Sequence, residues 1–320
     1  MRGLRTSAFA PERRSAAPLA LGSLATMPLT ALAPSLEDEV APDTAAFYRR
    51  ALRVLTDAGV PFLVGGAFAH ACFTGIRRST KDLDLFIRRA DYERVAALAL
   101  AEGWHTELAY PHWLAKVYQG TEFIDLIFNS GNGLAPVDEH WFEGNAQAEV
   151  LGVPVRVANI EDGLLSKAFI MERERYDGAD VAHLLHAGAE ELDWPGLLER
   201  FGRHWRVLLA HLVLFGFIYP GERQRVPAWV MEKLVSRLGA ETRQPAGADP
   251  HVCCGTLLSR EQYLYDVEQR GYVDGRLTPV STMTPRDVDG WTEAIPARQA
   301  ECAEEDPPLQ PEEGEDAGRV

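Results

Sequence analysis

Cysteine is scarce in this sequence, with four among 320 residues. Cys253 and Cys254 are adjacent, so they are poorly placed to bridge each other, and the chain has no CxxC or Cys/His spacing typical of a zinc site. This pattern disfavours a fold stabilised by disulfides or zinc. It suits the reducing cytoplasm, where we expect the protein to reside.

Long apolar segments are also missing. The longest, Val207–Tyr219, has 13 residues and contains His211, so it is too short to cross a bilayer. We predict a buried helix there and expect no membrane partner.

Positive charge is in deficit, with 32 lysines and arginines against 47 aspartates and glutamates and a net charge of −15. This balance argues against a broad, salt-dependent grip on a nucleic-acid backbone. Residues 301–320 hold eight acids and one base, however, and so supply −7 of the −15. The rest of the chain is only moderately acidic, which leaves room for a local basic groove.

The first 35 residues differ in composition from the rest of the chain. Four arginines precede a mildly apolar segment, which would suit a secretory signal. Pro18, Gly22 and Pro28 interrupt that segment, so we favour a disordered extension or a start codon assigned too early.

Hydrophobic periodicity divides the remaining chain. Short segments with strand-like alternation dominate up to about residue 158, and apolar residues then recur at helical spacing from Ile160 to about Leu238. We therefore predict an α+β fold, in which a mixed β-sheet flanked by helices is followed by a helical domain. The expected divisions are a disordered extension (1–42), the sheet domain (43–158), the helical domain (159–240), a partly ordered docking segment (241–300) and an acidic disordered tail (301–320).

Two aspartates stand in an apolar strand. Asp82 and Asp84 flank Leu83, and side chains at i and i+2 on a strand point to the same face. Two like charges this close are unfavourable unless a cation lies between them, and oxygen-only ligands suit Mg²⁺. A third acid, Asp125, interrupts another predicted strand, Glu122–Phe128. Three carboxylates converging from neighbouring strands can hold two metal ions.

A glycine pair precedes the acids. Gly65 and Gly66 lie between a predicted strand and a predicted helix, and Asp82 comes 16 residues after Gly66. Glycines at such a turn let backbone N–H groups approach a phosphate at a helix N-terminus. The order is thus a phosphate-binding turn, a metal-binding strand and a third acid.

This order of motifs resembles the DNA polymerase beta-like nucleotidyltransferase superfamily. The resemblance is closest to small bacterial nucleotidyltransferases that include relatives of abortive-infection toxins. The residues that carry it are Gly65-Gly66, Arg78-x-Thr80-x-Asp82-Leu-Asp84-Leu and Phe123-Ile-Asp125-Leu, with a further likeness in residues 160–180.

The resemblance implies the nucleotidyltransferase fold and the roles of the motif residues. Asp82, Asp84 and Asp125 would bind two Mg²⁺ ions, and Gly65 and Gly66 would hold the triphosphate. Asp125 is the candidate general base. Many members of the superfamily have Ser where this chain has Gly66, so phosphate contact at that position would rest on backbone amides alone.

Three other residues are candidate nucleotide ligands. Arg78 and Thr80 precede the metal strand and could contact phosphate or brace Asp82, although a solvated loop would look the same. Lys167 could reach the triphosphate as a point charge, or could be an ordinary surface lysine.

We therefore predict a Mg²⁺-dependent nucleotidyltransferase that moves a nucleoside monophosphate from an NTP, with ATP as one candidate, to an acceptor hydroxyl on RNA, a protein or a small molecule. An inactive nucleotide-binding module of a toxin–antitoxin or operon pair is less favoured, because degenerate members usually lose one of the three acids. A glycosyltransferase is also less favoured, because only about 80 residues precede the acid pair, which is short for the nucleotide domain of those enzymes.

Overall fold

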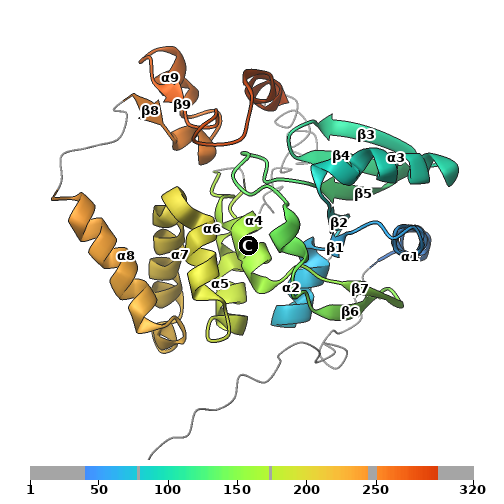
Figure 1. Ribbon diagram of the computed structural model, residues 1–320, viewed down its shortest axis with the longest axis horizontal. Coiled ribbons are helices and arrows are strands. Elements are labelled where there is room, and N and C mark those ends of the chain that lie inside the picture. The colour runs from blue at the N-terminus through green and yellow to red at the C-terminus, as the bar shows by residue number, and fades with distance from the viewer. Residues whose placement is uncertain (1–39, 78–79, 173–174, 244–250, 295–320) are drawn as a thin grey trace, which may run out of the picture.

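The computed structural model describes residues 40–77, 80–172, 175–243 and 251–294. A mixed five-stranded sheet, with strand order β1-β2-β5-β4-β3, lies beside a block of helices, and a C-terminal segment runs along one edge of both (Figure 1). The strands are β1 (Leu63–Val64), β2 (Leu83–Phe86), β3 (His105–Tyr110), β4 (Leu114–Gln119), β5 (Glu122–Ile127), β6 (Gln147–Val150), β7 (Val153–Arg156), β8 (Val252–Cys253) and β9 (Val273–Asp274). Strands β2 and β5 are parallel, and the other neighbours in the large sheet are antiparallel.

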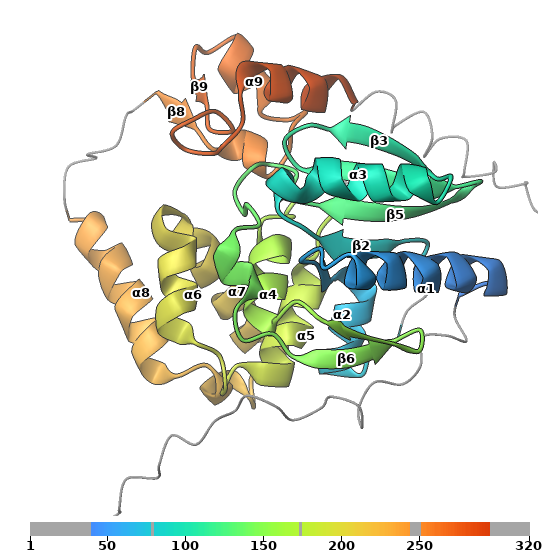
Figure 2. The same ribbon diagram turned by 45° about the vertical axis from the view of Figure 1, so that its right-hand side comes forward.

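Seven of the nine α-helices in the described part of the chain fall into two groups. Helices α1 and α3 cover one face of the sheet (Figure 2), whereas α4 to α8 form the helical block. Their bounds are α1 (Pro42–Asp57), α2 (Gly66–Thr74), α3 (Tyr92–Ala101), α4 (Ile160–Ala168), α5 (Gly178–Gly188), α6 (Trp194–Phe201), α7 (Trp205–Ile218), α8 (Ala228–Glu241) and α9 (Leu264–Glu268).

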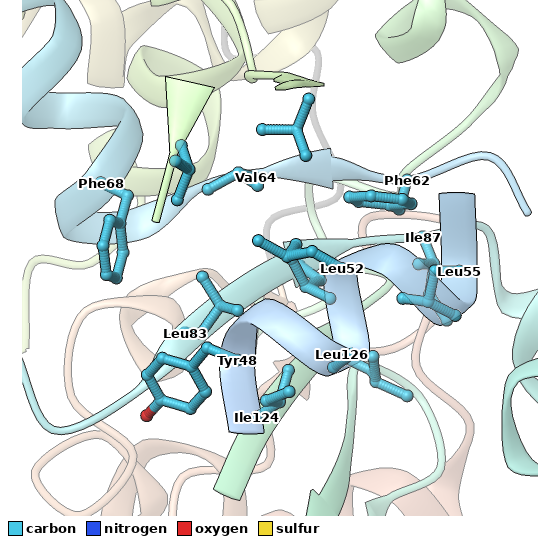
Figure 3. Packing of buried hydrophobic residues seen from close by; sticks show 14 of the residues in the cluster. Tyr48, Leu52, Leu55, Phe62, Val64, Phe68, Leu83, Ile87, Ile124 and Leu126 are labelled. Atoms are coloured by element: carbon cyan, nitrogen blue, oxygen red, sulfur yellow. The ribbon is translucent and has the colours of Figure 1, made fainter. Parts of the chain in front are cut away.

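Alternation along the strands builds the first core. Leu83 on β2 and Ile124 and Leu126 on β5 point toward α1, where they meet Leu52 and Tyr48 (Figure 3). All five side chains are buried. Because successive strand residues face opposite ways, the residues between these leucines and isoleucines lie on the other face of the sheet.

The described residues cover that other face only in part. At one end a row of apolar residues crosses the strands and is buried by the helical block: Leu63 pairs with Phe86, and Phe86 with Ile127. The next two rows toward the opposite end are polar or aromatic, and they carry the candidate site described below.

The C-terminal segment is fixed to the sheet half by hydrogen bonds and aromatic contacts. Thr282 donates from its hydroxyl to the Gly133 carbonyl (2.7 Å), and Ser281 does the same to the Asn132 carbonyl (2.7 Å). Trp291 packs edge-on against Tyr110, with ring centroids 4.9 Å apart. Residues 251–294 therefore pack against the loop that comes after β5.

The fold class and most elements agree with the sequence predictions. The mixed sheet flanked by helices and followed by a helical block is confirmed. Strand β6 is absent from those predictions, because the segment Gln147–Val150 has only four residues and includes alanine and glutamate, which are depleted in strands. The proposed divisions stay predictions. Residues 1–39 of the expected extension (1–42) and the whole expected tail (301–320) lie outside the described part.

The helix predicted at Val207–Tyr219 is present as α7, but it is buried on one face only. Helix α7 buries Leu208, Leu212 and Phe215, but Phe217 is 82% exposed and Val213 56% exposed. Apart from His211 and Gly216 the segment is apolar on every side of the helix, so its pattern cannot reveal that only one face is covered. Among the described residues, no helix is long and apolar enough to span a membrane.

Candidate active site

Three carboxylates meet on the partly open face of the sheet. Asp84 on β2 lies opposite Asp125 on the parallel strand β5, and Asp82 precedes β2 by one residue. One carboxylate oxygen of each residue lies within 4.8 Å of one oxygen of each of the others. The structure thus brings together the three acids that the sequence singled out, and their roles stay predictions.

Cross-strand register explains the meeting. Leu83 and Leu85 are fully buried in the core beneath α1, so Asp84 between them must point to the opposite face. The same parity holds on β5, where Ile124 and Leu126 are buried and Asp125 faces away from them. Parallel pairing of the two strands then places the carboxylates side by side.

The electrostatics of this trio favour a cation. Burial, reinforced by the charges of Asp82 and Asp125, raises the pKa of the Asp84 carboxyl to about 7. Burial also raises the pKa of Asp125, and Lys116 opposes that rise. A carboxyl that holds its proton this strongly is one whose negative charge lacks compensation. An oxygen-only donor set of three carboxylates therefore fits a hard divalent ion such as Mg²⁺.

Lys116 is a member of the site that the sequence analysis missed. Its Nζ lies 2.7 Å from Asp125 Oδ1 and 3.9 Å from the centroid of the Phe123 ring. Lys116 is the direct cross-strand partner of Asp125 on β4. A lone lysine in a strand is a weak signal, and only the register of β4 against β5 reveals its partner.

Thr80 braces the first carboxylate. Its hydroxyl lies 2.8 Å from Asp82 Oδ1 and 3.0 Å from the Asp82 carbonyl oxygen. A hydroxyl with both acceptors so close holds the Asp82 side chain in one orientation. Arg78, the other candidate in this loop, lies outside the described residues.

The glycine turn lies directly against Asp84. The Gly65 N–H donates to the Asp84 carbonyl (2.9 Å), and helix α2 begins at the next residue. Gly66 has φ +53°, and a Cβ built on it would lie 1.7 Å from Asp84 Oδ2. A Cβ on Gly65 would lie 2.3 Å from the Phe86 ring. Both positions therefore require glycine, for contact reasons that the sequence alone does not show.

A family model described as uncharacterised nucleotidyltransferase matches residues 17–214, which is more than half of the chain. The chain belongs to this family. The membership confirms the resemblance to the nucleotidyltransferase superfamily noted in the sequence. No curated protein sequence matches the chain.

Solved structures with a chain path similar to that of this protein include the following three. A lincosamide antibiotic adenylyltransferase, LnuA, bound to lincomycin is 14% identical, with 47% of this chain and 99% of that chain covered and a TM-score of 0.34. The antibiotic-resistance factor ANT(2″)-Ia is 17% identical over 63% and 97%, with a TM-score of 0.34. A nucleotidyltransferase-like protein from Paracoccidioides brasiliensis is 14% identical over 59% and 94%, with a TM-score of 0.37.

In this family member, Lys167 belongs to a buried ionic cluster behind the glycine turn. Its Nζ lies 2.6 Å from Asp180 Oδ2 and 3.0 Å from Asp177 Oδ2. Lys167 lines a small cavity together with Gly65 and Gly66, and its charge lowers the pKa of Asp84. Its field therefore reaches the carboxylate trio, although two other carboxylates already hold its ammonium group.

Replacing Lys167 with methionine is expected to lower the free energy of unfolding by about 3 kcal/mol, because Asp177 and Asp180 would keep buried charges without their ammonium partner. Chemical denaturation measures the loss. A double variant, Lys167→Met with Asp180→Asn, should recover part of it. Lys233→Met, at an exposed position of α8, is the matched control and should change stability by less than about 0.5 kcal/mol. Equal losses in both single variants would contradict the buried cluster.

Proposed function

We propose that this protein transfers a nucleoside monophosphate from an NTP to an acceptor hydroxyl and releases pyrophosphate. The observation that carries the proposal is the meeting of Asp82, Asp84 and Asp125 beside the Gly65–Gly66 turn. In this assignment Asp82, Asp84 and Asp125 would hold Mg²⁺, which would supply positive charge for the triphosphate and would acidify the attacking hydroxyl.

The residues of the chain divide the remaining tasks. The backbone N–H groups at the start of α2, where the helix dipole is positive, would hold the β and γ phosphates. The proposed base is the Asp125 carboxylate, which takes the acceptor proton as the hydroxyl oxygen forms its bond to the α phosphorus. The bond from the α phosphorus to the bridging oxygen breaks, and pyrophosphate leaves. Lys116 would keep Asp125 oriented for this proton transfer.

Three further residues would support nucleotide binding. Thr80 keeps the Asp82 carboxylate oriented. Lys167 supports the wall of the cavity beside the glycine turn. Arg78 remains a proposed phosphate ligand on the strength of the sequence motif.

The direct test is incubation of the full chain with each α-labelled NTP, Mg²⁺ and separate pools of RNA, protein and small-molecule acceptors. Labelled product together with released pyrophosphate supports the proposal. Tight binding of a Mg²⁺–NTP complex without transfer to any pool would favour the inactive nucleotide-binding module. Failure to bind any NTP would refute both functions.

Mg²⁺ binding should depend on pH in a direction fixed by Asp84. Its pKa is about 7 in the folded, metal-free protein against an ordinary value of 3.8, so between these values the folded state holds a proton that the unfolded chain has lost. Metal-free stability therefore falls as pH rises through this window. Because Mg²⁺ must displace that proton, its affinity should be about tenfold weaker at pH 6 than at pH 8. Calorimetric titration at both pH values measures this.

The control for this experiment is Asp84→Asn, which has no proton to displace. It should bind Mg²⁺ weakly, with little difference between pH 6 and pH 8. Equal affinity of the unmodified protein at the two pH values would contradict a protonated Asp84.

A further inference from the structure

An aromatic row extends across the open face of the sheet from the carboxylate trio. The row consists of Phe123 on β5, Tyr118 on β4 and His105 on β3, and cross-strand pairing joins Phe123 to Tyr118 and Tyr118 to His105. The pairing parity that points Asp125 and Lys116 to this face also points the three rings there. None of the three rings belongs to either apolar core.

The rings form one continuous surface. The centroids of Phe123 and Tyr118 lie 6.0 Å apart, and those of Tyr118 and His105 lie 6.1 Å apart with an interplanar angle of 25°. Phe123 and Tyr118 are half-buried and His105 is exposed. The Phe123 ring is tilted by 50° from Tyr118 and has Lys116 Nζ over its face, so Tyr118 and His105 provide the surface on which another ring can pack.

A cavity of about 460 Å³ opens at the far end of the row, and its lining is Gly103, His105, Glu107, Tyr118, Gln119 and Gly120. This volume is within the range of small-molecule sites. Among the described residues, this lining contains one carboxylate, Glu107, and neither lysine nor arginine. Lys116 is the cross-strand partner of Glu107, but its ammonium group pairs with Asp125. Glu107 accepts a hydrogen bond from the Tyr118 hydroxyl (3.0 Å), which fixes the carboxylate beside the row.

The position of the row matches the direction from which an acceptor must come. The glycine turn lies at the β1–β2 side of the trio, whereas the aromatic row begins on β5 beside Asp125 and runs toward β3. If the triphosphate is held at the turn, the attacking hydroxyl reaches the α phosphorus from the Asp125 side. A molecule lying on the aromatic row has its near end at Asp125.

We propose that the aromatic row and Glu107 form the acceptor subsite, and that the acceptor is a small, hydroxyl-bearing ring compound with a neutral or cationic far end. A ring with an apolar face packs on Tyr118 and His105, and an ammonium group pairs with Glu107. A polyanionic chain would meet a carboxylate and no compensating cation in the cavity. This inference rests on the proposed nucleotidyl transfer for the orientation of the acceptor.

The test uses three sugar trimers of similar size and different charge: the cationic glucosamine trimer, neutral cellotriose and the anionic galacturonate trimer. Each is titrated into the full chain by calorimetry, and saturation-transfer NMR reports which protons contact the protein. The glucosamine trimer should bind most tightly and the galacturonate trimer least. Tyr118→Ala and His105→Ala should each weaken binding of the glucosamine trimer about tenfold.

A second variant guards against unfolding at Tyr118. Glu107 is exposed, so Glu107→Gln should keep the fold. This variant should weaken binding of the glucosamine trimer about tenfold and binding of cellotriose less than about twofold. Leu100→Ser, at a 75% exposed position of α3 on the other side of the sheet, is the control and should bind all three trimers unchanged.

If all variants bind the trimers equally well, the aromatic row is not the acceptor subsite. Tighter binding of the galacturonate trimer than of the glucosamine trimer also overturns the proposal. So does tighter binding of a short single-stranded RNA with a free 3′ hydroxyl, titrated in the same way. A separate titration with a non-hydrolysable NTP and Mg²⁺ tests the proposed function itself, and the three subsite variants should leave that affinity unchanged. If the NTP analogue fails to bind, nucleotidyl transfer is refuted, while the sugar titrations still decide whether the row is a ligand site.

Discussion

Asp84→Asn is expected to lower nucleotidyl transfer by about a thousandfold or more, because an asparagine oxygen carries no charge with which to hold Mg²⁺ between the acids. The substitution keeps the size of the side chain. It also removes a carboxyl whose pKa is raised to about 7, so the metal-free variant should be at least as stable as the unmodified protein above that pH. The measurements are transfer of labelled nucleotide and thermal unfolding without metal.

A more stable protein that has lost transfer would separate function from folding. Asp57→Asn, at an exposed position at the end of α1, is the matched control and should change neither quantity. Retention of activity within about tenfold in Asp84→Asn would mean that this carboxylate does not hold the catalytic ion. Binding of a non-hydrolysable NTP with Mg²⁺ gives the same comparison before an acceptor is known.

Among substitutions that add a single methyl group to the site, Gly66→Ala should cause the largest loss of stability and of NTP binding. The new Cβ would lie 1.7 Å from Asp84 Oδ2, so the carboxylate or the start of α2 must move. The backbone φ of +53° adds strain for any residue with a side chain. We expect a loss of about 2–3 kcal/mol in stability and about a hundredfold in Mg²⁺-dependent NTP binding.

The other end of the same helix provides the control. Gly75 comes directly after α2 with φ +69°, and a Cβ built there meets nothing within 4 Å. Gly75→Ala should therefore cost about 1 kcal/mol of backbone strain and leave NTP binding unchanged. If both alanine variants bind NTP equally well, the close approach of Gly66 to Asp84 is not needed for NTP binding.

The three acids could be found from the sequence because each breaks a local rule. An aspartate between buried leucines or isoleucines conflicts with the composition of a core strand, and the period of two then places Asp82 and Asp84 on one face. Gly65 and Gly66 could be found for a similar reason, since a glycine pair between a strand and a helix allows a close backbone approach. Such signals involve residues close together in the chain.

Partners that are distant in the chain could not be found in the same way. Lys116 meets Asp125 only because β4 pairs with β5 in one particular register. The sequence makes Lys167 a candidate phosphate ligand or a surface lysine, and it cannot show that the ammonium group pairs with Asp177 and Asp180. The aromatic row combines three strands, and each ring alone has the composition of an ordinary strand residue.

By itself, the sequence determined most of the strands and helices along the chain and the face on which each carboxylate stands. Those properties follow from periodicity and backbone sterics, which act over a few residues. Only the tertiary structure decided the strand order, the ion pairs and the uncovered part of the sheet. Each of these depends on which segments pack together, and packing is settled by the whole core rather than by any local pattern.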